Sequence, residues 1–242
     1  MFKSIAGSAV LLLLSFQAQA TLISSTSWDG AGKDLQSLFD GWVDPGYDVN
    51  AEYQAPGYWT MGVTGQSAAT LIIEIAGNRN LNKFGLFDRQ DSSNRLEVYD
   101  GAAGGGAKRT ITYDPVTKKY RVIDTDAIAL VDSSIFSGSS FGFYLEGPGG
   151  TFFSDSALNS DEVQMVAFQG EGQNADFFGT GDAPWLSNEW ILAWEDLVYT
   201  GSDQDFNDLV MVIESVTPVP EPGTLVLLGF GLFGLVLLRR RV

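Results

Sequence analysis

Short segments of alternating apolar and polar residues run through the chain from residue 69 to residue 213, and Gly, Pro, Asp and Asn separate them. A period of two places successive side chains on opposite faces of an extended strand. About ten short strands joined by such turns predict an all-β fold, an antiparallel β-sandwich or jelly roll. The segments with this character span residues 69–76, 82–88, 95–100, 108–114, 120–124, 140–146, 151–154, 164–169, 189–195 and 209–213.

Two local patterns add detail to this prediction. Residues 95–100, 108–114 and 120–124 follow one another with turns between them, which predicts a β-meander. Within the turn-rich segment 21–59, apolar residues stand at positions 35, 38 and 39, and this i, i+3, i+4 spacing predicts one short helix. No long amphipathic helix is predicted in the body of the chain.

The chain contains no Cys and no His in its 242 residues. Their absence excludes disulfides, thiolate nucleophiles, Ser-His-Asp triads and zinc sites with Cys or His ligands. A metal site in this chain must therefore be built from oxygen ligands, which favour hard cations such as Ca²⁺ or Mg²⁺.

The charge of the chain is strongly negative and unevenly distributed. Lys and Arg number 14 against 30 Asp and Glu, and no Lys or Arg occurs between Arg121 and Arg239. Residues 122–218 carry 17 Asp and Glu. Because such a chain repels phosphate, we expect no nucleic-acid partner. Solubility accounts for a negative net charge, but it does not account for the loss of cations from one half only.

The N-terminus has the three parts of a secretory signal peptide. Lys3 gives a positive start, residues 5–16 are apolar, and Ala18 and Ala20 form an A-x-A cleavage site. We expect residues 1–20 to be removed, so that the mature chain lies outside the cytoplasm.

The C-terminus has the properties of a short membrane-spanning helix. Pro218, Pro220 and Pro222 hold the approach to it extended, and residues 223–238 contain no charge. As a helix these residues span about 24 Å, against a hydrocarbon core of about 30 Å. The Arg cluster at 239–241 ends the segment and is expected to remain on the cytoplasmic side.

This order of Pro-Glu-Pro motif, Gly-rich apolar helix and basic cluster resembles the PEP-CTERM sorting signal. The resemblance covers residues 218–242, and the residues that carry it are Pro220, Glu221, Pro222, Arg239, Arg240 and Arg241. It implies recognition by an exosortase, a membrane protease-transpeptidase of Gram-negative bacteria that make exopolysaccharide. It also implies transient anchoring in the inner membrane, cleavage near the Pro-Glu-Pro motif, and onward sorting to the cell surface or extracellular matrix.

The stretch WEDLVYTGSDQDFNDLVMVIE, residues 194–214, holds six carboxylates and no Lys, Arg or His. Its central D-x-D-x-N spacing places alternating side-chain oxygens on one side of a turning backbone, and Ca²⁺ takes six to eight such oxygens. Without a cation, these carboxylates would repel one another and raise some of their own pKa values. We expect Phe206 and Leu209 to pin the loop to the core. The candidate ligands are Glu195, Asp196, Asp203, Asp205, Asn207 and Asp208.

Other interpretations of this stretch remain open. An EF-hand is nearly matched, but Asp208 stands where its Gly is required, and residues 209–213 read as a strand. Glu214 would then lie about 20 Å from Asp208, too far to share an ion. The loop could also be a solvated acidic turn whose Asx side chains cap backbone donors. A catalytic carboxylate pair, as in glycosidases, is the third interpretation.

The same stretch resembles part of a β domain of unknown function that is common in PEP-CTERM and other secreted bacterial proteins. That pattern has an aromatic-E-D-hydrophobic motif, a Gly-rich spacer and D-x-D-aromatic-N-D before a final strand. Residues 141–159 resemble the start of the domain, and the whole resemblance covers residues 139–214. It implies calcium binding by the six candidate ligands named above. The spacer VYTGS holds one Gly where two or three are usual.

These observations predict four parts in the chain. They are a signal peptide over residues 1–20, an N-terminal part of the β-sandwich over 21–138, a C-terminal β domain with the acidic loop over 139–217 and the sorting signal over 218–242. The charge shift near residues 125–140 leaves both one continuous sandwich and two domains open.

The expected function is that of a secreted, Ca²⁺-binding structural or adhesive protein of the cell surface or exopolysaccharide matrix. Its expected partners are an exosortase, the membrane and exopolysaccharide, and we expect it not to be an enzyme. The alternative is a carbohydrate-binding module or a glycan hydrolase. Trp185, Trp190 and Trp194 could stack on sugars in such a site, although the same-face spacing of Trp190 and Trp194 favours core packing.

Overall fold

The computed structural model describes residues 23–43, 46–62, 64–73 and 80–220. The expected signal peptide, with Ala18 and Ala20, lies outside these residues. So do Glu221, Pro222 and the basic cluster Arg239, Arg240 and Arg241 of the sorting signal. Within the described residues, no helix is long and apolar enough to cross a membrane; the helix expected over residues 223–238 is not among them.

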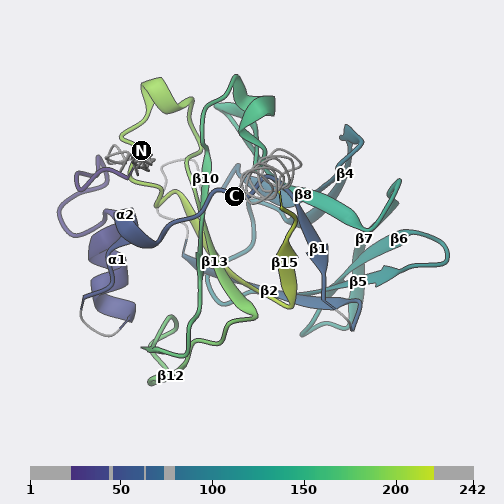
Figure 1. The fold of residues 1–242 in the computed structure, drawn as a ribbon, viewed down its shortest axis with the longest axis horizontal. Coiled ribbons are helices and arrows are strands. Elements are labelled where there is room, and N and C mark those ends of the chain that lie inside the picture. The colour runs from purple at the N-terminus through teal and green to yellow at the C-terminus, as the bar shows by residue number, and fades with distance from the viewer. Residues whose placement is uncertain (1–22, 44–45, 63, 74–79, 221–242) are drawn as a thin grey trace, which may run out of the picture.

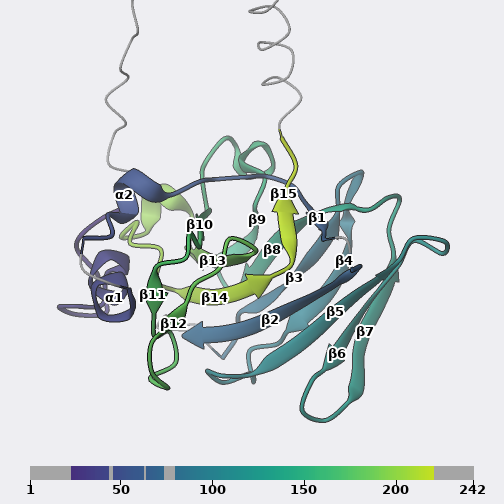
Figure 2. The same ribbon diagram turned by 60° about the horizontal axis from the view of Figure 1, so that its bottom comes forward.

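The described chain is mostly β, with antiparallel sheets and few helices, as the sequence predicts (Figures 1 and 2). One sheet has six strands in the order β15-β1-β8-β3-β4, with β9 paired to β8. Its strands are β1 (Trp59–Met61), β3 (Lys83–Asp88), β4 (Asp91–Tyr99), β8 (Ser140–Gly147), β9 (Gly150–Phe153) and β15 (Val216–Pro218).

The other large sheet has seven strands in the order β10-β13-β14-β2-β5-β6-β7. Its strands are β2 (Gln66–Ile73), β5 (Lys108–Asp114), β6 (Lys119–Asp124), β7 (Ala129–Ile135), β10 (Met165–Gln169), β13 (Glu189–Trp194) and β14 (Leu209–Glu214). A small hairpin of β11 (Asn174–Ala175) and β12 (Ala183–Pro184) stands beside it. Two short 3-10 turns, η1 (Ser156–Asn159) and η2 (Tyr199–Gly201), complete the elements between these strands.

The predicted β-meander of residues 95–100, 108–114 and 120–124 is wrong. Residues 95–99 belong to β4, which lies in the six-stranded sheet, whereas β5 and β6 lie in the other sheet and continue into β7. The eight residues of 100–107 are long enough to carry the chain from one sheet to the other. By contrast, the four residues of 115–118 make a tight turn between β5 and β6.

A single hydrophobic cluster fills the space between the two large sheets. It takes side chains from both, including Trp59 and Phe143 from the six-stranded sheet and Trp190 and Trp194 from the other. The rings of Trp59 and Trp190 meet edge to face with centroids 5.0 Å apart. Trp190 and Trp194 therefore serve core packing, as their same-face spacing predicts.

A second hydrophobic cluster covers the outer face of β10, β13 and β14. Helix α1 (Leu35–Trp42) has Asp34 as its N-cap, and with α2 (Val49–Glu52) it packs on this face. Phe39 of α1 meets Phe168 of β10 with ring centroids 4.7 Å apart. Both faces of β13 and β14 are therefore buried, which explains the continuous apolar runs on either side of the acidic stretch. The short helix predicted near residues 35–39 is confirmed.

Strands from before and after residue 139 share both large sheets. β14 lies between β13 and β2, and β1 lies between β15 and β8. The last described residues continue from β15, where the Val219 amide donates to the Tyr58 carbonyl at 2.8 Å. The segment that leads to the sorting signal therefore starts from an edge strand of the six-stranded sheet.

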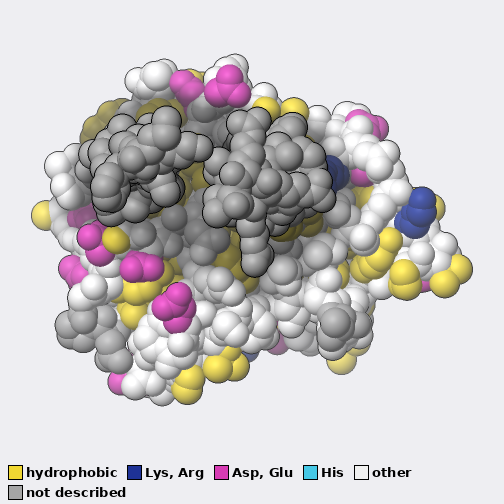
Figure 3. Space-filling view, viewed as in Figure 1, with side chains coloured by type: hydrophobic (Ala, Val, Ile, Leu, Met, Phe, Trp, Pro, Cys, Tyr) yellow, Lys and Arg dark blue, Asp and Glu magenta, His cyan; other side chains and the backbone are white. Residues whose placement is uncertain are grey.

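Charged side chains are unevenly spread over the face drawn in Figure 3. The Lys and Arg side chains visible there lie toward the side of β5, β6 and β7, while Asp and Glu dominate the side of α1 and β12. Because no Lys or Arg occurs between Arg121 and Arg239, the part of the chain from β7 to β15 contains Asp and Glu but no basic residue.

Candidate metal centre

The two strands that flank the acidic loop bring its ends together. β13 and β14 pair antiparallel with Trp194 opposite Leu209, so Glu195 leaves β13 where the loop enters β14. Leu209 is 2% exposed in the core between the sheets, and Phe206 is fully buried in the cluster under α1. The prediction that Phe206 and Leu209 pin the loop to the core is confirmed.

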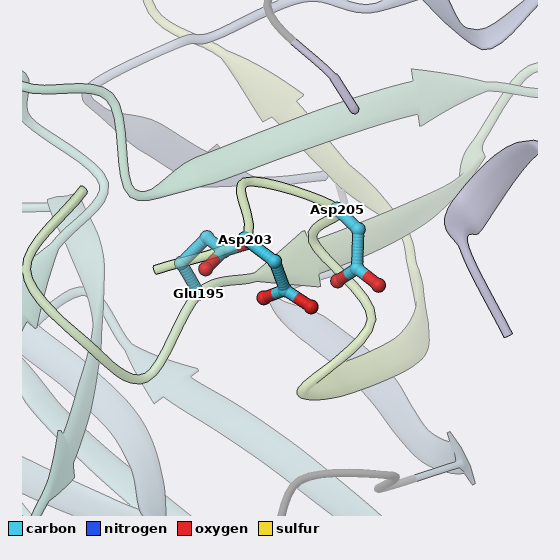
Figure 4. Close-up of side chains that lie close together, drawn as sticks. All are labelled: Glu195, Asp203 and Asp205. Atoms are coloured by element: carbon cyan, nitrogen blue, oxygen red, sulfur yellow. The ribbon is translucent and has the colours of Figure 1, made fainter. Parts of the chain in front are cut away.

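Three carboxylates of this loop form a group that could hold a metal ion. Glu195, Asp203 and Asp205 each offer one oxygen atom, and these atoms lie within 4.8 Å of one another. Figure 4 shows the three carboxylates next to one another, with Glu195 directed toward Asp203. Glu195 and Asp205 are fully buried, whereas Asp203 is partly exposed.

Glu195 is the least satisfied member of the group. Its Oε1 accepts a hydrogen bond from the Phe206 amide at 2.6 Å. Its Oε2 is buried and has no hydrogen-bond partner among the described residues. Burial raises the pKa of Glu195 to about 7; hydrogen bonding by the Ser202 side chain and the Phe206 amide lowers it, and the negative charges of Asp205 and Asp203 raise it. The protein donors around Glu195 therefore do not offset the cost of burying its charge.

Asp205 is held by Asn207 and also carries a perturbed pKa. Asp205 Oδ1 accepts from the Asn207 amide at 3.2 Å, and Oδ2 accepts from Asn207 Nδ2 at 2.7 Å. Burial raises the pKa of Asp205 to about 7, and Asp203 raises it further while hydrogen bonds lower it. The Oδ1 atom of Asn207 is buried without a hydrogen-bond partner among the described residues.

The backbone of the loop alternates between ordinary and left-handed conformations. Gln204 and Phe206, which are not glycines, have φ angles of 62° and 55°. Such conformations cost about 1–3 kcal/mol for each residue and persist where the surroundings impose them. These two strained residues alternate along the loop with Asp203, Asp205 and Asn207.

Asp196 and Asp208 form a second carboxylate pair beside the first group. The Asp196 amide donates to Asp208 Oδ2 at 2.8 Å, and Asn82 Nδ2 donates to Asp196 Oδ2 at 2.9 Å. Burial raises the pKa of Asp208 to about 9, and Asp196 and Glu195 contribute to the shift. The six candidate ligands thus divide into a group of three carboxylates, a neighbouring pair and Asn207, which supports Asp205.

Sequence analysis missed several residues that touch the loop. Asn82 comes from just before β3, and its separation of 114 residues from Asp196 leaves no sequence signal. The segment 27–33 also reaches the loop: the Trp28 amide donates to Asp203 Oδ2, and the Lys33 carbonyl accepts from Asn207 Nδ2. The Ser, Asp and Gly content of that segment marks it only as a turn.

No cation of the protein neutralises the loop within the described residues. The ion pairs found there are Lys83–Glu97, Arg95–Glu146 and Arg109–Asp124, and none includes a carboxylate of the loop. The donor set consists of carboxylate and amide oxygens, which suits hard cations. Glu214, at the other end of β14, lies opposite Glu189 and not in the loop.

Comparison with known proteins gives matches over two segments of the chain. Residues 127–216 match a domain of unknown function (DUF4114), and residues 218–241 match the PEP-CTERM protein-sorting motif. The first match begins at β7 and includes the whole acidic loop, but not strands β1 to β6 of the two sheets. No curated protein and no solved structure matches the chain. The chain thus carries a DUF4114 domain followed by a PEP-CTERM motif, which implies export, transient membrane anchoring and processing by an exosortase.

Proposed function

We propose that this protein is an exported, calcium-stabilised β-sandwich that acts as a structural or adhesive component of the cell surface or exopolysaccharide matrix. Export and exosortase processing follow from the sorting motif. The role of calcium rests on one observation: Glu195 is fully buried, and its Oε2 has no partner among the described residues while it lies beside Asp203 and Asp205.

A divalent cation reverses the electrostatics of the loop. Without it, Glu195, Asp205 and Asp208 carry raised pKa values because burial and neighbouring negative charges oppose their ionisation. With a cation among them, each carboxylate is attracted to the ion, and the unpartnered Oε2 of Glu195 can become a ligand of it. The strained backbone at Gln204 and Phe206 then belongs to a loop shaped for that ion.

The donor set of the group suits Ca²⁺. Ca²⁺ is bound by carboxylate and amide oxygens about 2.3–2.6 Å away and tolerates irregular geometry, whereas Mg²⁺ requires a near-ideal octahedron. The three carboxylates each offer one oxygen, and these oxygens lie within 4.8 Å of one another, close enough to share one ion.

We assign roles to all six candidate ligands on this basis. Glu195, Asp203 and Asp205 bind the ion directly. Asn207 orients Asp205 through its side chain. Asp208 holds the Asp196 amide, and Asp196 adds negative charge beside the group. The proposal gives none of these carboxylates a catalytic role.

Calorimetric titration and thermal melting test the proposal. The mature protein, freed of metal, should bind Ca²⁺ with measurable heat, and its melting temperature should rise because the ion binds the folded state. The double variant Asp203→Asn, Asp205→Asn should lose both effects. A control variant, Asp126→Asn, alters an exposed residue between β6 and β7 and should retain both. No heat and an unchanged melting temperature for the unaltered protein would refute calcium binding.

The alternative function, a carbohydrate-binding module or glycan hydrolase, is not supported by the three tryptophans expected to stack on sugars. Trp185, Trp190 and Trp194 are between 0 and 2% exposed, so none of the three offers a ring face to a sugar. Glycan-array binding by the metal-loaded protein distinguishes the alternatives: binding to an exopolysaccharide fragment supports a carbohydrate-binding role. Release of sugar from such a fragment would support a hydrolase.

A further inference from the structure

The N-terminal strap, defined as residues 23–34, lies against the acidic loop, although 174 to 180 residues separate the side chains of the loop from their partners in the strap. The Trp28 amide donates to Asp203 Oδ2, and Asn207 Nδ2 donates to the Lys33 carbonyl at 2.7 Å. A carboxylate has two oxygens, so the bond from Trp28 orients Asp203 and leaves its second oxygen for an ion. The strap thus holds one of the three grouped carboxylates directly.

Ser27 connects the strap to the loop through its hydroxyl group. Ser27 Oγ accepts from Asn207 Nδ2 at 3.1 Å and, within the strap, from the Asp29 amide at 3.1 Å. Hydrogen bonding by the Ser27 side chain also lowers the pKa of Asp205, and since a carboxylate only accepts, the hydroxyl is the donor there. Ser27 therefore supports Asp205 together with Asn207, the side chain that already orients it.

Both ends of the strap are anchored outside the loop. Ile23 is 1% exposed and packs in the hydrophobic cluster that includes Phe39 of α1. The Asn50 side chain brackets Ile23, because its Oδ1 accepts from the Ile23 amide at 3.1 Å and its Nδ2 donates to the Ile23 carbonyl at 3.0 Å. At the other end, Asp34 caps α1 through the Ser37 amide at 3.1 Å. The strap therefore offers the loop a support that is fixed to the body of the protein.

Groups that hold metal ligands in place contribute to affinity without touching the ion, and losing one typically weakens binding about 10- to 100-fold. We propose that the N-terminal strap is the outer shell of the metal centre and that Ser27 is a positioning residue, which holds Asp205 and Asn207 for binding of the ion. This inference rests on the calcium site proposed above. It places part of the centre outside residues 127–216, the segment that matches the DUF4114 domain.

Docking of the strap and binding of the ion should then favour each other, since such coupling is reciprocal. Hydrogen exchange measures docking at the Ser24 and Trp28 amides, which donate to the Gln204 carbonyl and to Asp203 Oδ2. In the mature protein, calcium should slow the exchange of both amides by about tenfold. The Val116 amide, in the exposed turn between β5 and β6, is the reference and should exchange at an unchanged rate.

Calorimetric titration of three variants tests the role of Ser27. Ser27→Ala removes the hydroxyl and should weaken Ca²⁺ binding by about tenfold. Ser27→Thr keeps the hydroxyl and should bind Ca²⁺ as the unaltered protein does. Ser25→Ala, which changes an exposed serine of the same strap, is the matched control and should also bind normally.

These measurements separate the inference from the proposed function. If the unaltered mature protein binds no Ca²⁺, the proposed function fails. If it binds Ca²⁺ but Ser27→Ala binds as tightly as Ser25→Ala, or Ser27→Thr binds as weakly as Ser27→Ala, the inference about the strap alone is overturned. The same holds if the Ser24 and Trp28 amides exchange equally fast with and without calcium.

Discussion

At the residue scale, Glu195 is the side chain on which the proposed calcium site most depends. Its carboxylate is buried, and its Oε2 has no hydrogen-bond partner among the described residues. Ionising it is costly in the metal-free protein, and a bound cation would offset that cost. Replacement by Gln tests both effects with one variant. The shape of the side chain is kept and the charge is removed, while the new amide has the Asp203 and Asp205 carboxylates as neighbours.

We therefore predict opposite effects of Glu195→Gln on stability and on calcium binding. The free energy of unfolding of the metal-free protein at pH 8 should rise by about 2 kcal/mol, since the variant no longer has to ionise a buried acid. The rise in melting temperature on adding Ca²⁺ should disappear. Urea unfolding and thermal melting measure the two effects. Glu171→Gln, at an exposed position, serves as the control, and a destabilised metal-free Glu195→Gln protein would contradict this interpretation.

The pKa values of the loop also predict how pH affects the metal-free protein. The values for Glu195 and Asp205 are raised to about 7 and that for Asp208 to about 9. Acids with raised pKa values favour the folded state when protonated, so their stabilising effect is complete below the unfolded values near pH 4 and is lost as pH rises toward 9. The pKa values of Asp114 and Asp124 are lowered from 3.8, so protonation of these two groups changes the stability only at pH values below this window.

Urea unfolding of metal-stripped protein should thus show stability falling from pH 5 to pH 9. Saturating Ca²⁺ should flatten or reverse this slope, because the ion binds the ionised carboxylates. Equal slopes with and without Ca²⁺ would contradict a shared site for the ion and these protons.

The sequence identifies the six candidate ligands of the loop, but it does not show which three carboxylates form the group that could hold an ion. The D-x-D-x-N spacing and the buried strands on either side point to Glu195, Asp203 and Asp205, which the register of β13 and β14 brings together. Partners such as Asn82 and Trp28 come from distant segments whose own sequences carry only turn signals. Their contacts depend on the tertiary fold, which no local pattern encodes.

At the element scale, the site depends on the close approach of the β8–β9 turn. A Cβ atom on Gly149 would lie 2.3 Å from the Asp196 carbonyl and 3.2 Å from Leu197. Both neighbours follow β13, and the Asp196 carbonyl is backbone that cannot easily move. Gly149 therefore allows this turn to support the segment that carries Glu195 and Asp196.

We predict that Gly149→Ala lowers the free energy of unfolding by about 1–3 kcal/mol and weakens Ca²⁺ binding, because overpacking shifts the segment after β13. Gly104→Ala is the matched control, since a Cβ atom added at Gly104 would meet no described atom within 4 Å, and we expect a change within about 0.5 kcal/mol. Chemical denaturation and calorimetric titration give both quantities. Equal stability of the two variants would show that the close approach has no energetic consequence.

The strands were predicted more reliably than their arrangement. Segments of alternating residues such as 108–114 and 140–146 are strands in the molecule. Strand β7 was missed because it is a largely exposed edge strand, with Leu130 62% and Ile135 61% exposed, and so lacks the alternation that burial on one face imposes. The placement of β4 in the opposite sheet depends on packing between the sheets, which the pattern of a single strand does not report.

At the scale of the whole molecule, the sorting motif follows the folded body in the chain. The motif starts at residue 218, the last residue of β15, so the two sheets and the acidic loop precede most of the motif. The proposed calcium site would then fill after export.

Replacing Pro220, Glu221 and Pro222 by Ala should block processing, because the Pro-Glu-Pro motif marks the cleavage region. The full-length chain should then accumulate in the membrane fraction, while the unaltered protein is released from it in shortened form. Fractionation followed by mass spectrometry of the C-terminus measures this. Pro115→Ala, in the exposed turn between β5 and β6, is the control. Normal shortening of the triple variant would show that processing does not depend on the motif.

A crystal structure grown in millimolar calcium, with anomalous diffraction recorded, tests the calcium centre most directly. We expect one anomalous peak bounded by oxygens of Glu195, Asp203 and Asp205, each about 2.3–2.6 Å away. Well-ordered side chains at these three positions with no anomalous peak between them would contradict it.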